Sequence, residues 1–137
     1  MKLLGYKRIT GKLEVLTGLH IGAGSESTQI GGLDNPIIRL PLNGYPYIPG
    51  SSLKGKMRSL LELTLDKVEN SGDVHKYTDA CEKNKCPICY VFGAAAGDGA
   101  PIGPGRLVVR DAVIDEDHEA NKQIKERSPG LPFSEEK

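Results

Sequence analysis

No stretch of apolar residues in this sequence approaches the length of about 20 residues that a membrane-spanning helix needs. The N-terminus also lacks the apolar core of a secretory signal peptide. Cysteine is scarce: three residues, an odd number, do not make the disulfide framework of a secreted domain. The sequence therefore predicts a cytoplasmic protein that has no membrane partner.

A net charge is also absent, because 18 basic and 18 acidic residues cancel. This balance hides an asymmetry, since residues 1–60 carry eight Lys or Arg but only three acidic residues. A basic half is typical of a protein that binds a polyanion, although solvated surface charge gives the same pattern. The length of 137 residues fits one domain with its own core, and 17 Gly with 9 Pro predict long loops.

The central stretch, residues 45–65, contains the clearest helix signal. A short apolar run ends at Pro49, and Ser51 or Ser52 can then accept a hydrogen bond from a first-turn amide, as an N-cap does. The following residues recur at helical spacing and predict one stripe that faces the core. The stripe consists of Leu53, Met57, Leu60, Leu61, Thr64 and Val68.

The start of this helix is a candidate anion site. Lys54 and Arg58 are four residues apart, so they share one flank of the helix near its first-turn amides. We interpret the Gly-Ser-Ser turn and the two cations as a phosphate-binding site, and an ordinary capped surface helix is the alternative. A nucleotide-binding P-loop fits poorly, because Met57 stands where that motif needs a hydroxyl for magnesium.

Three other segments have strand character. Residues 5–16 alternate, and Ile9, Leu13 and Val15 are predicted to face inward. Residues 36–48 predict a hairpin with its turn at Asn43-Gly44, and residues 106–114 predict a further strand. The tail at residues 115–137 is polar and has no apolar periodicity, which predicts loop or disorder.

Metal-ligating residues cluster after the central helix. The two cysteines of Cys86-Pro87-Ile88-Cys89 have the spacing that lets both thiolates reach one zinc ion, and Cys81 and His75 can complete a tetrahedral set. A thioredoxin-like redox pair is the alternative, but that motif lies between a strand and a helix. We therefore predict a structural Zn²⁺ bound by these four residues.

Several stretches resemble the RAMP superfamily of CRISPR proteins (repeat-associated mysterious proteins), in particular the repeated backbone subunit of the type III-A (Csm) interference complex. The family has a similar zinc-binding insertion. Sequence motifs of its loops, first helix and a later strand resemble residues 17–24, 30–36, 47–58 and 106–112 of this chain. The resemblance implies an α+β fold with a ferredoxin-like (RRM-like) core, of which this chain holds the N-terminal portion. Residues 1–114 would form that partial domain with an insertion at 66–104, and residues 115–137 would be a polar tail or a linker to a missing C-terminal half.

The same resemblance implies roles for individual residues. His20 and Gly22 fall in a loop that lines the family's RNA groove, and Ser51, Ser52, Lys54 and Arg58 fall in its first-helix signature. Asp34 matches an aspartate that the family requires for metal-dependent cleavage of target RNA. Its carboxylate can ligate a divalent ion such as Mg²⁺ or help remove the proton of the attacking 2′-hydroxyl. Without the resemblance, turn formation explains Asp34 and a satisfied loop histidine explains His20.

The leading hypothesis is an endoribonuclease subunit that binds CRISPR RNA. Copies would stack along that RNA beside other subunits of the type III-A complex, and Asp34 would cut paired target RNA at regular intervals. The alternative is a non-catalytic, structural RNA-binding subunit of a similar complex. A third hypothesis, a small zinc-binding module unrelated to RNA, predicts no salt-dependent affinity for RNA.

Overall fold

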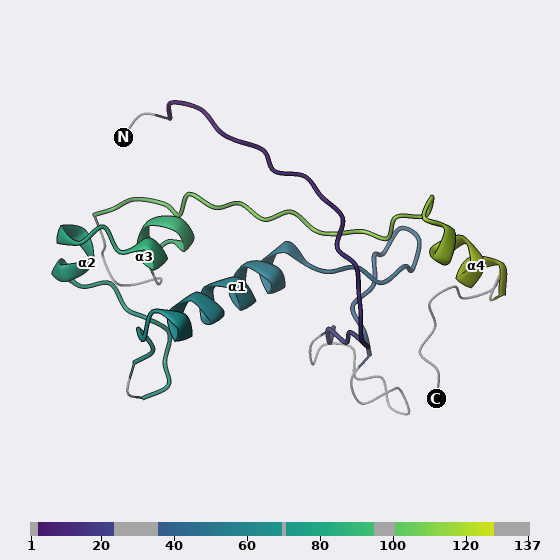
Figure 1. Ribbon diagram of the computed structural model, residues 1–137, viewed down its shortest axis with the longest axis horizontal. Helices are drawn as coiled ribbons and strands as arrows, with labels where there is room; N and C mark the ends of the chain where they lie inside the picture. Colours follow the sequence, from purple (N-terminus) through teal and green to yellow (C-terminus); the bar gives the residue numbers. More distant parts are fainter. Residues whose placement is uncertain (1–2, 24–35, 70, 95–100, 128–137) are drawn as a thin grey trace. The chain divides into compact units, whose positions relative to one another are not determined.

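The computed structural model describes residues 3–23, 36–69, 71–94 and 101–127. Its helices are α1 (Gly50–Thr64), α2 (Asp79–Lys83), α3 (Pro87–Phe92) and α4 (Glu119–Arg127), shown in Figure 1. The chain forms two compact units, one from Met1–Thr10 and Gly50–Arg110, the other from Gly11–Pro49 and Asp111–Lys137. No helix among the described residues has the length and apolar character needed to cross a membrane.

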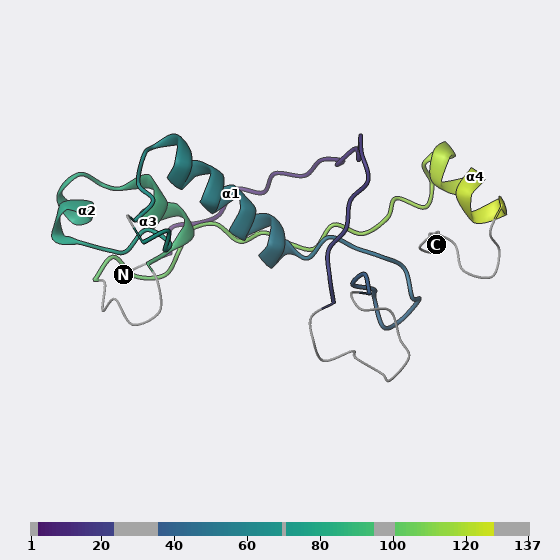
Figure 2. The same cartoon turned by 90° about the horizontal axis from the view of Figure 1, so that it is seen from below.

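The core of the first unit lies around α2 and α3, which sit beside the C-terminal end of α1 in both views (Figures 1 and 2). Its buried members are mainly cysteines and isoleucines, and half-buried Leu61, Tyr77, Tyr90 and Ala94 pack against them. The buried set is Cys81, Cys86, Ile88, Cys89 and Ile102. This core is small, so the cysteine side chains are a large part of what holds the unit together.

Helix α1 forms where the sequence predicts it, but the face of the helix that is buried differs from the predicted one. Met57 is 42% exposed and Leu60 is 51% exposed, whereas the charged Glu62 is only 3% exposed. The prediction that Met57, Leu60 and Val68 face the core is therefore wrong. Helical spacing decides which residues share a face, but the contacts made by Arg58 and Glu62 decide which face the rest of the unit covers.

The start of α1 also differs from the prediction. The helix begins at Gly50, so Ser51 and Ser52 lie inside its first turn, and neither is the N-cap. A side chain at Gly50 would not fit, because its Cβ would lie 2.3 Å from the Val109 carbonyl oxygen and 2.8 Å from the Arg110 carbonyl carbon. The 109–110 backbone thus packs directly against the first residue of α1, which only glycine allows.

A second close approach joins the end of α3 to residues 105–107. The Arg106 and Leu107 amides both donate to the Val91 carbonyl at 2.9 Å, and the Arg106 side chain donates to the Tyr90 carbonyl at 2.9 Å. A Cβ at Gly105 would lie 2.6 Å from the Phe92 carbonyl oxygen. Glycine at position 105 therefore allows the backbone of residues 105–107 to pack closely against the end of α3.

The predicted strands do not form within the described residues, where β pairing is limited to isolated antiparallel bridges. These bridges join Gly22 to Ile37, Arg39 to Pro46 and Ile48 to Ala112. The segment expected to be a strand at residues 5–16 is exposed throughout, and Ile9, Leu13 and Val15 do not face inward. An alternating sequence supplies two faces, but a strand also needs a continuous partner for its amides and carbonyls.

The turn expected at residues 43–44 is present in the second unit. The Leu40 amide donates to the Tyr45 carbonyl at 2.8 Å, and Gly44 has a φ of +69°. The Tyr45 amide also donates to the Asn43 side-chain oxygen at 3.0 Å. Asn43 and Gly44 therefore lie at a turn as predicted, but only Gly44 has a positive φ, so it is not the two-residue type I′ turn that Asn-Gly favours, and the flanking segments meet at a single bridge.

Helix α4 corrects the prediction of loop or disorder for part of the tail. Glu119 lies in its first turn and Lys125 and Arg127 in its last, which complements the helix dipole. Lys125 also forms a 2.8 Å ion pair with Glu116. None of its residues is buried, so α4 has no apolar stripe that packs against a core. A prediction based on apolar periodicity therefore does not find this helix.

Candidate metal centre and predicted RNA-binding residues

Four metal-ligating side chains converge in the core of the first unit. One ligand atom from each of His75, Cys81, Cys86 and Cys89 lies within 4.8 Å of all the others, and all four residues are buried. These are the four residues that the sequence spacing proposed. Three thiolates and one imidazole within this span suit a closed tetrahedral zinc site.

Local backbone structure brings the cysteines together. Cys81 lies in α2, and the Cys86 amide donates to the Cys81 carbonyl at 2.9 Å, across a turn in which Lys85 has a φ of +49°. Cys86 then stands directly before α3, and Pro87 occupies the start of the helix, where its missing amide proton costs nothing. Cys86 and Cys89 are three residues apart at this helix start, so both thiols point to one side.

The electrostatics of the cluster favour a cation at its centre. The His75 Nε2 atom lies 3.3 Å from the Cys81 sulfur and 3.5 Å from the Cys86 sulfur. Burial raises the pKa of the Cys89 thiol to about 12, and the negative charge of a nearby Cys86 thiolate is the second largest cause of this rise. Burial also opposes ionisation of Cys81, but hydrogen bonds with Thr78, Cys89 and Cys86 together outweigh it and lower the pKa of that thiol. A divalent cation would remove the repulsion between neighbouring thiolates and hold all of them ionised.

The redox alternative has less support in this geometry. Residues 71–85, which precede Cys86, contain no strand, whereas a thioredoxin-like pair follows one. Cys86 and Cys89 are also enclosed with a third thiol and an imidazole rather than exposed as a reactive pair. The arrangement is that of a ligand set.

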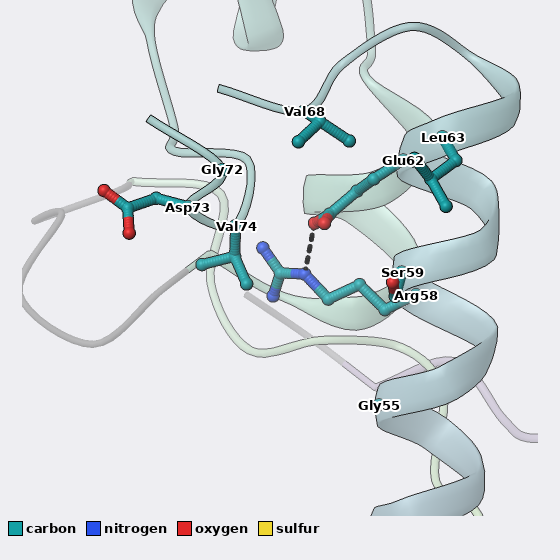
Figure 3. Close-up of a pocket in the computed structure, with 9 residues that line it drawn as sticks. All are labelled: Gly55, Arg58, Ser59, Glu62, Leu63, Val68, Gly72, Asp73 and Val74. Carbon is teal, nitrogen blue, oxygen red and sulfur yellow. Dashed lines mark hydrogen bonds and ion pairs between the residues drawn. The ribbon is translucent and has the colours of Figure 1, made fainter. Parts of the chain in front are cut away.

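A largely buried ion pair lies on α1 in the same unit as this cluster. The Arg58 Nε atom donates to the Glu62 carboxylate at 2.7 Å, and the side chains of these residues are 17% and 4% exposed. Figure 3 shows both side chains beside a cavity of about 340 Å³ that is also lined by Val68, Asp73 and Val74. This pair was not predicted, although an arginine and a glutamate four residues apart on a helix are a recognisable pairing signal.

The predicted RNA-binding residues fall into both units. Ser51 and Ser52 are exposed and Lys54 is half-buried, all at the start of α1 in the first unit. His20 and Gly22 are exposed in the second unit, where Gly22 pairs with Ile37. The structure brings the α1 residues together at one helix end.

Asp34 and Arg58 differ from the other predicted site residues. Asp34 lies outside the described residues, so its expected catalytic role stays a prediction. All three nitrogens of the Arg58 guanidinium bond to groups within the chain. An RNA contact by Arg58 could therefore use only the second N–H of each terminal nitrogen.

Comparison with known proteins identifies the class. The RAMP superfamily matches residues 12–136, which is most of the chain, and the protein belongs to this superfamily. Two relatives are both named CRISPR system Cms endoribonuclease Csm3. The one from Methanothermobacter thermautotrophicus is 51% identical over 115 residues, and the one from Enterococcus italicus is 63% identical over 105 residues. These alignments cover 76% and 77% of this chain, but 44% and 45% of the relatives.

A more distant relative extends the similarity within the superfamily. The protein named CRISPR system Cmr endoribonuclease Cmr4, from Pyrococcus furiosus, is 46% identical over 57 residues. That match covers 42% of this chain and 18% of the relative. The chain thus spans less than half the length of each of these relatives.

Proposed function

We propose that this protein is the CRISPR RNA-binding backbone subunit of a type III-A interference complex, and that it cleaves complementary target RNA. The observation that carries the proposal is the similarity, at up to 63% identity, to proteins named CRISPR system Cms endoribonuclease Csm3. Its partners are CRISPR RNA, target RNA, further copies of itself and the other subunits of the complex. The site of action is the cytoplasm, where these RNAs are found.

A ferredoxin-like core is the fold that goes with this function. Superfamily membership supports it. Residues 1–114 would contribute this domain, with the metal-binding segment as an insertion at 66–104 and residues 115–137 as tail or linker.

The start of α1 is the proposed contact for the CRISPR RNA backbone. Ser51 and Ser52 are exposed there, and first-turn amides of a helix attract phosphate. The Lys54 ammonium adds a cation on the next turn. His20 and Gly22 would contact RNA from the other unit, the first by hydrogen bonding or stacking and the second by close backbone approach.

The metal centre is proposed to bind one structural Zn²⁺. His75, Cys81, Cys86 and Cys89 would supply a closed set of four ligands, which leaves no open position for chemistry. When bound, the ion would cross-link α2, α3 and the segment before α2. Because the surrounding core is small, this cross-link would contribute much of the stability of the first unit.

Asp34 is the proposed catalytic residue for RNA cleavage. RNA carries its own nucleophile, the 2′-hydroxyl, so the protein has only to align that group with the leaving oxygen and balance charge in the transition state. A carboxylate can take the hydroxyl proton or hold a divalent ion such as Mg²⁺, to which RNA phosphates would add ligands. The similarity of residues 30–36 to the family's cleavage loop supports this assignment.

Reconstitution tests the proposal. The chain is assembled with CRISPR RNA and the partner subunits, and cleavage and binding of complementary RNA are measured on the same preparation. We expect regularly spaced products that disappear with EDTA and return with Mg²⁺. Asp34→Ala should abolish cleavage and leave target binding nearly intact, because a group that acts only in the transition state does not affect ground-state affinity.

The other outcomes are equally informative. Normal cleavage by the Asp34→Ala complex would reassign Asp34 to turn formation. Binding without any cleavage by the wild-type complex would show that the subunit is structural and not catalytic. Lost binding and lost cleavage together in the variant would make Asp34 a structural residue.

A further inference from the structure

The ion pair on α1 makes its remaining hydrogen bonds to the backbone around the metal ligands. Arg58 Nη2 donates to the His75 carbonyl at 3.0 Å, and Arg58 Nη1 donates to the Gly93 carbonyl at 3.1 Å. The Glu62 carboxylate oxygen that pairs with Arg58 also accepts from the His75 amide at 3.3 Å. Both polar backbone groups of His75 are therefore held by one side-chain pair.

These bonds restrain two of the ligand-bearing segments at once. His75 precedes α2 in an irregular segment, where no helix or strand fixes its backbone. Gly93 is the C-cap of α3, and its amide donates to the Cys89 carbonyl at 3.1 Å. Arg58 thus joins the segment of the histidine ligand to the end of the helix that carries Cys89, and it does so from a third element, α1.

We propose that Arg58 and Glu62 are positioning residues of the metal centre. The inference rests on the metal site put forward under the proposed function. The imidazole ring of a histidine ligand must be oriented toward the metal. The orientation of the His75 ring depends on the position of its backbone, which no helix or strand fixes. Partners outside the ligand set commonly set ligand orientation in this way, and their loss typically weakens metal binding about 10- to 100-fold.

The shape of the side chain explains why arginine occupies position 58. A guanidinium is a rigid plane whose donors diverge, so it can reach a carboxylate and two separate carbonyls together. A lysine ammonium is a point donor on a flexible stem and cannot span the same three acceptors. Figure 3 shows the plane of Arg58 directed from α1 toward Glu62 and the 72–74 segment.

The test measures metal binding by the full chain. Affinities for Zn²⁺ and Co²⁺ are determined by competition with a chromophoric chelator, and the visible spectrum of the Co²⁺ form reports the ligand set and its geometry. We expect Arg58→Met and the Arg58→Met/Glu62→Met double variant to bind about 10- to 100-fold more weakly, with altered Co²⁺ bands. Arg58→Lys should fall between these variants and wild type.

Two controls on the same helix separate positioning from general stability. Lys56→Met replaces an exposed cation and should bind both metals as wild type does. Leu53→Ala truncates a half-buried apolar side chain on the same helix, five residues before Arg58, and its Co²⁺ spectrum should stay unchanged even where its melting temperature falls. The double variant leaves no unpaired charge behind, so it also shows whether the single variant fails merely because Glu62 is left alone.

Each remaining outcome decides against the proposal. Wild-type affinity and spectrum in all Arg58 variants would overturn the positioning role while leaving the metal site intact. Equal weakening by Leu53→Ala and Arg58→Met, with unchanged Co²⁺ bands, would assign Arg58 to overall stability. Failure of the wild-type chain to bind either metal would overturn the metal site itself, and this result is distinct from the other two.

Discussion

Alanine substitution at two glycines of α1 should change stability in opposite directions. Gly50 and Gly55 lie five residues apart in the same helix. A Cβ at Gly50 would lie 2.3 Å from the Val109 carbonyl oxygen and 2.7 Å from its carbon, whereas a Cβ at Gly55 would meet nothing within 4 Å. The same added methyl group therefore meets backbone atoms at position 50 and open space at position 55.

The magnitudes follow from these surroundings. At Gly50 the new methyl group must displace backbone atoms, and such overpacking costs about 1–3 kcal/mol. At Gly55, alanine restricts the unfolded chain and favours the helix, which stabilises by about 0.5–1 kcal/mol. The two variants should differ by roughly 1.5–4 kcal/mol in the free energy of unfolding, with wild type between them.

Thermal and urea unfolding followed by helix circular dichroism measure this difference, with zinc held at one concentration because metal binding to the folded state shifts the apparent stability. If Gly50→Ala is as stable as Gly55→Ala, the 109–110 segment does not pack against the start of α1. A destabilised Gly55→Ala would show that something covers that face of the helix. Either result would contradict the packing described here.

Further predictions concern the metal, RNA binding and the second close approach. Elemental analysis of the chain purified without added metal should find one zinc per chain, and Cys89→Ser should lose it; a folded, active, metal-free preparation would contradict this. Lys54→Ala should weaken CRISPR RNA binding and reduce the slope of log affinity against log salt by about 1, because one phosphate contact is lost, whereas Arg58→Met should leave the slope unchanged. Gly105→Ala should destabilise the chain by about 1–3 kcal/mol, because the new Cβ would lie 2.6 Å from the Phe92 carbonyl oxygen; unfolding midpoints equal to wild type would show that this approach is not close.

The sequence alone determined the features that depend on local spacing. The helix at residues 50–64 follows from its periodicity and the turn at Gly44 from Asn-Gly, and both are present. Two of the candidate ligands were recognisable because the thiols of a Cys-Pro-x-Cys stretch, with two residues between them, can reach one ion, and Cys81 and His75 stand shortly before that stretch in the sequence. The sequences of a few short motifs were also enough to indicate the RAMP superfamily, which the comparison confirms.

Only the tertiary structure decided which face of α1 is covered and what Arg58 binds. Periodicity places Lys54 and Arg58 on one flank, but it cannot tell that Arg58 meets the carbonyls of His75 and Gly93, which are 17 and 35 residues away. The same holds for Gly50, whose neighbours at residues 109–110 are distant in sequence. Local patterns record which side chains share a surface, whereas the partner of that surface depends on where backbone groups distant in the sequence come to lie, since buried carbonyls need hydrogen-bond donors.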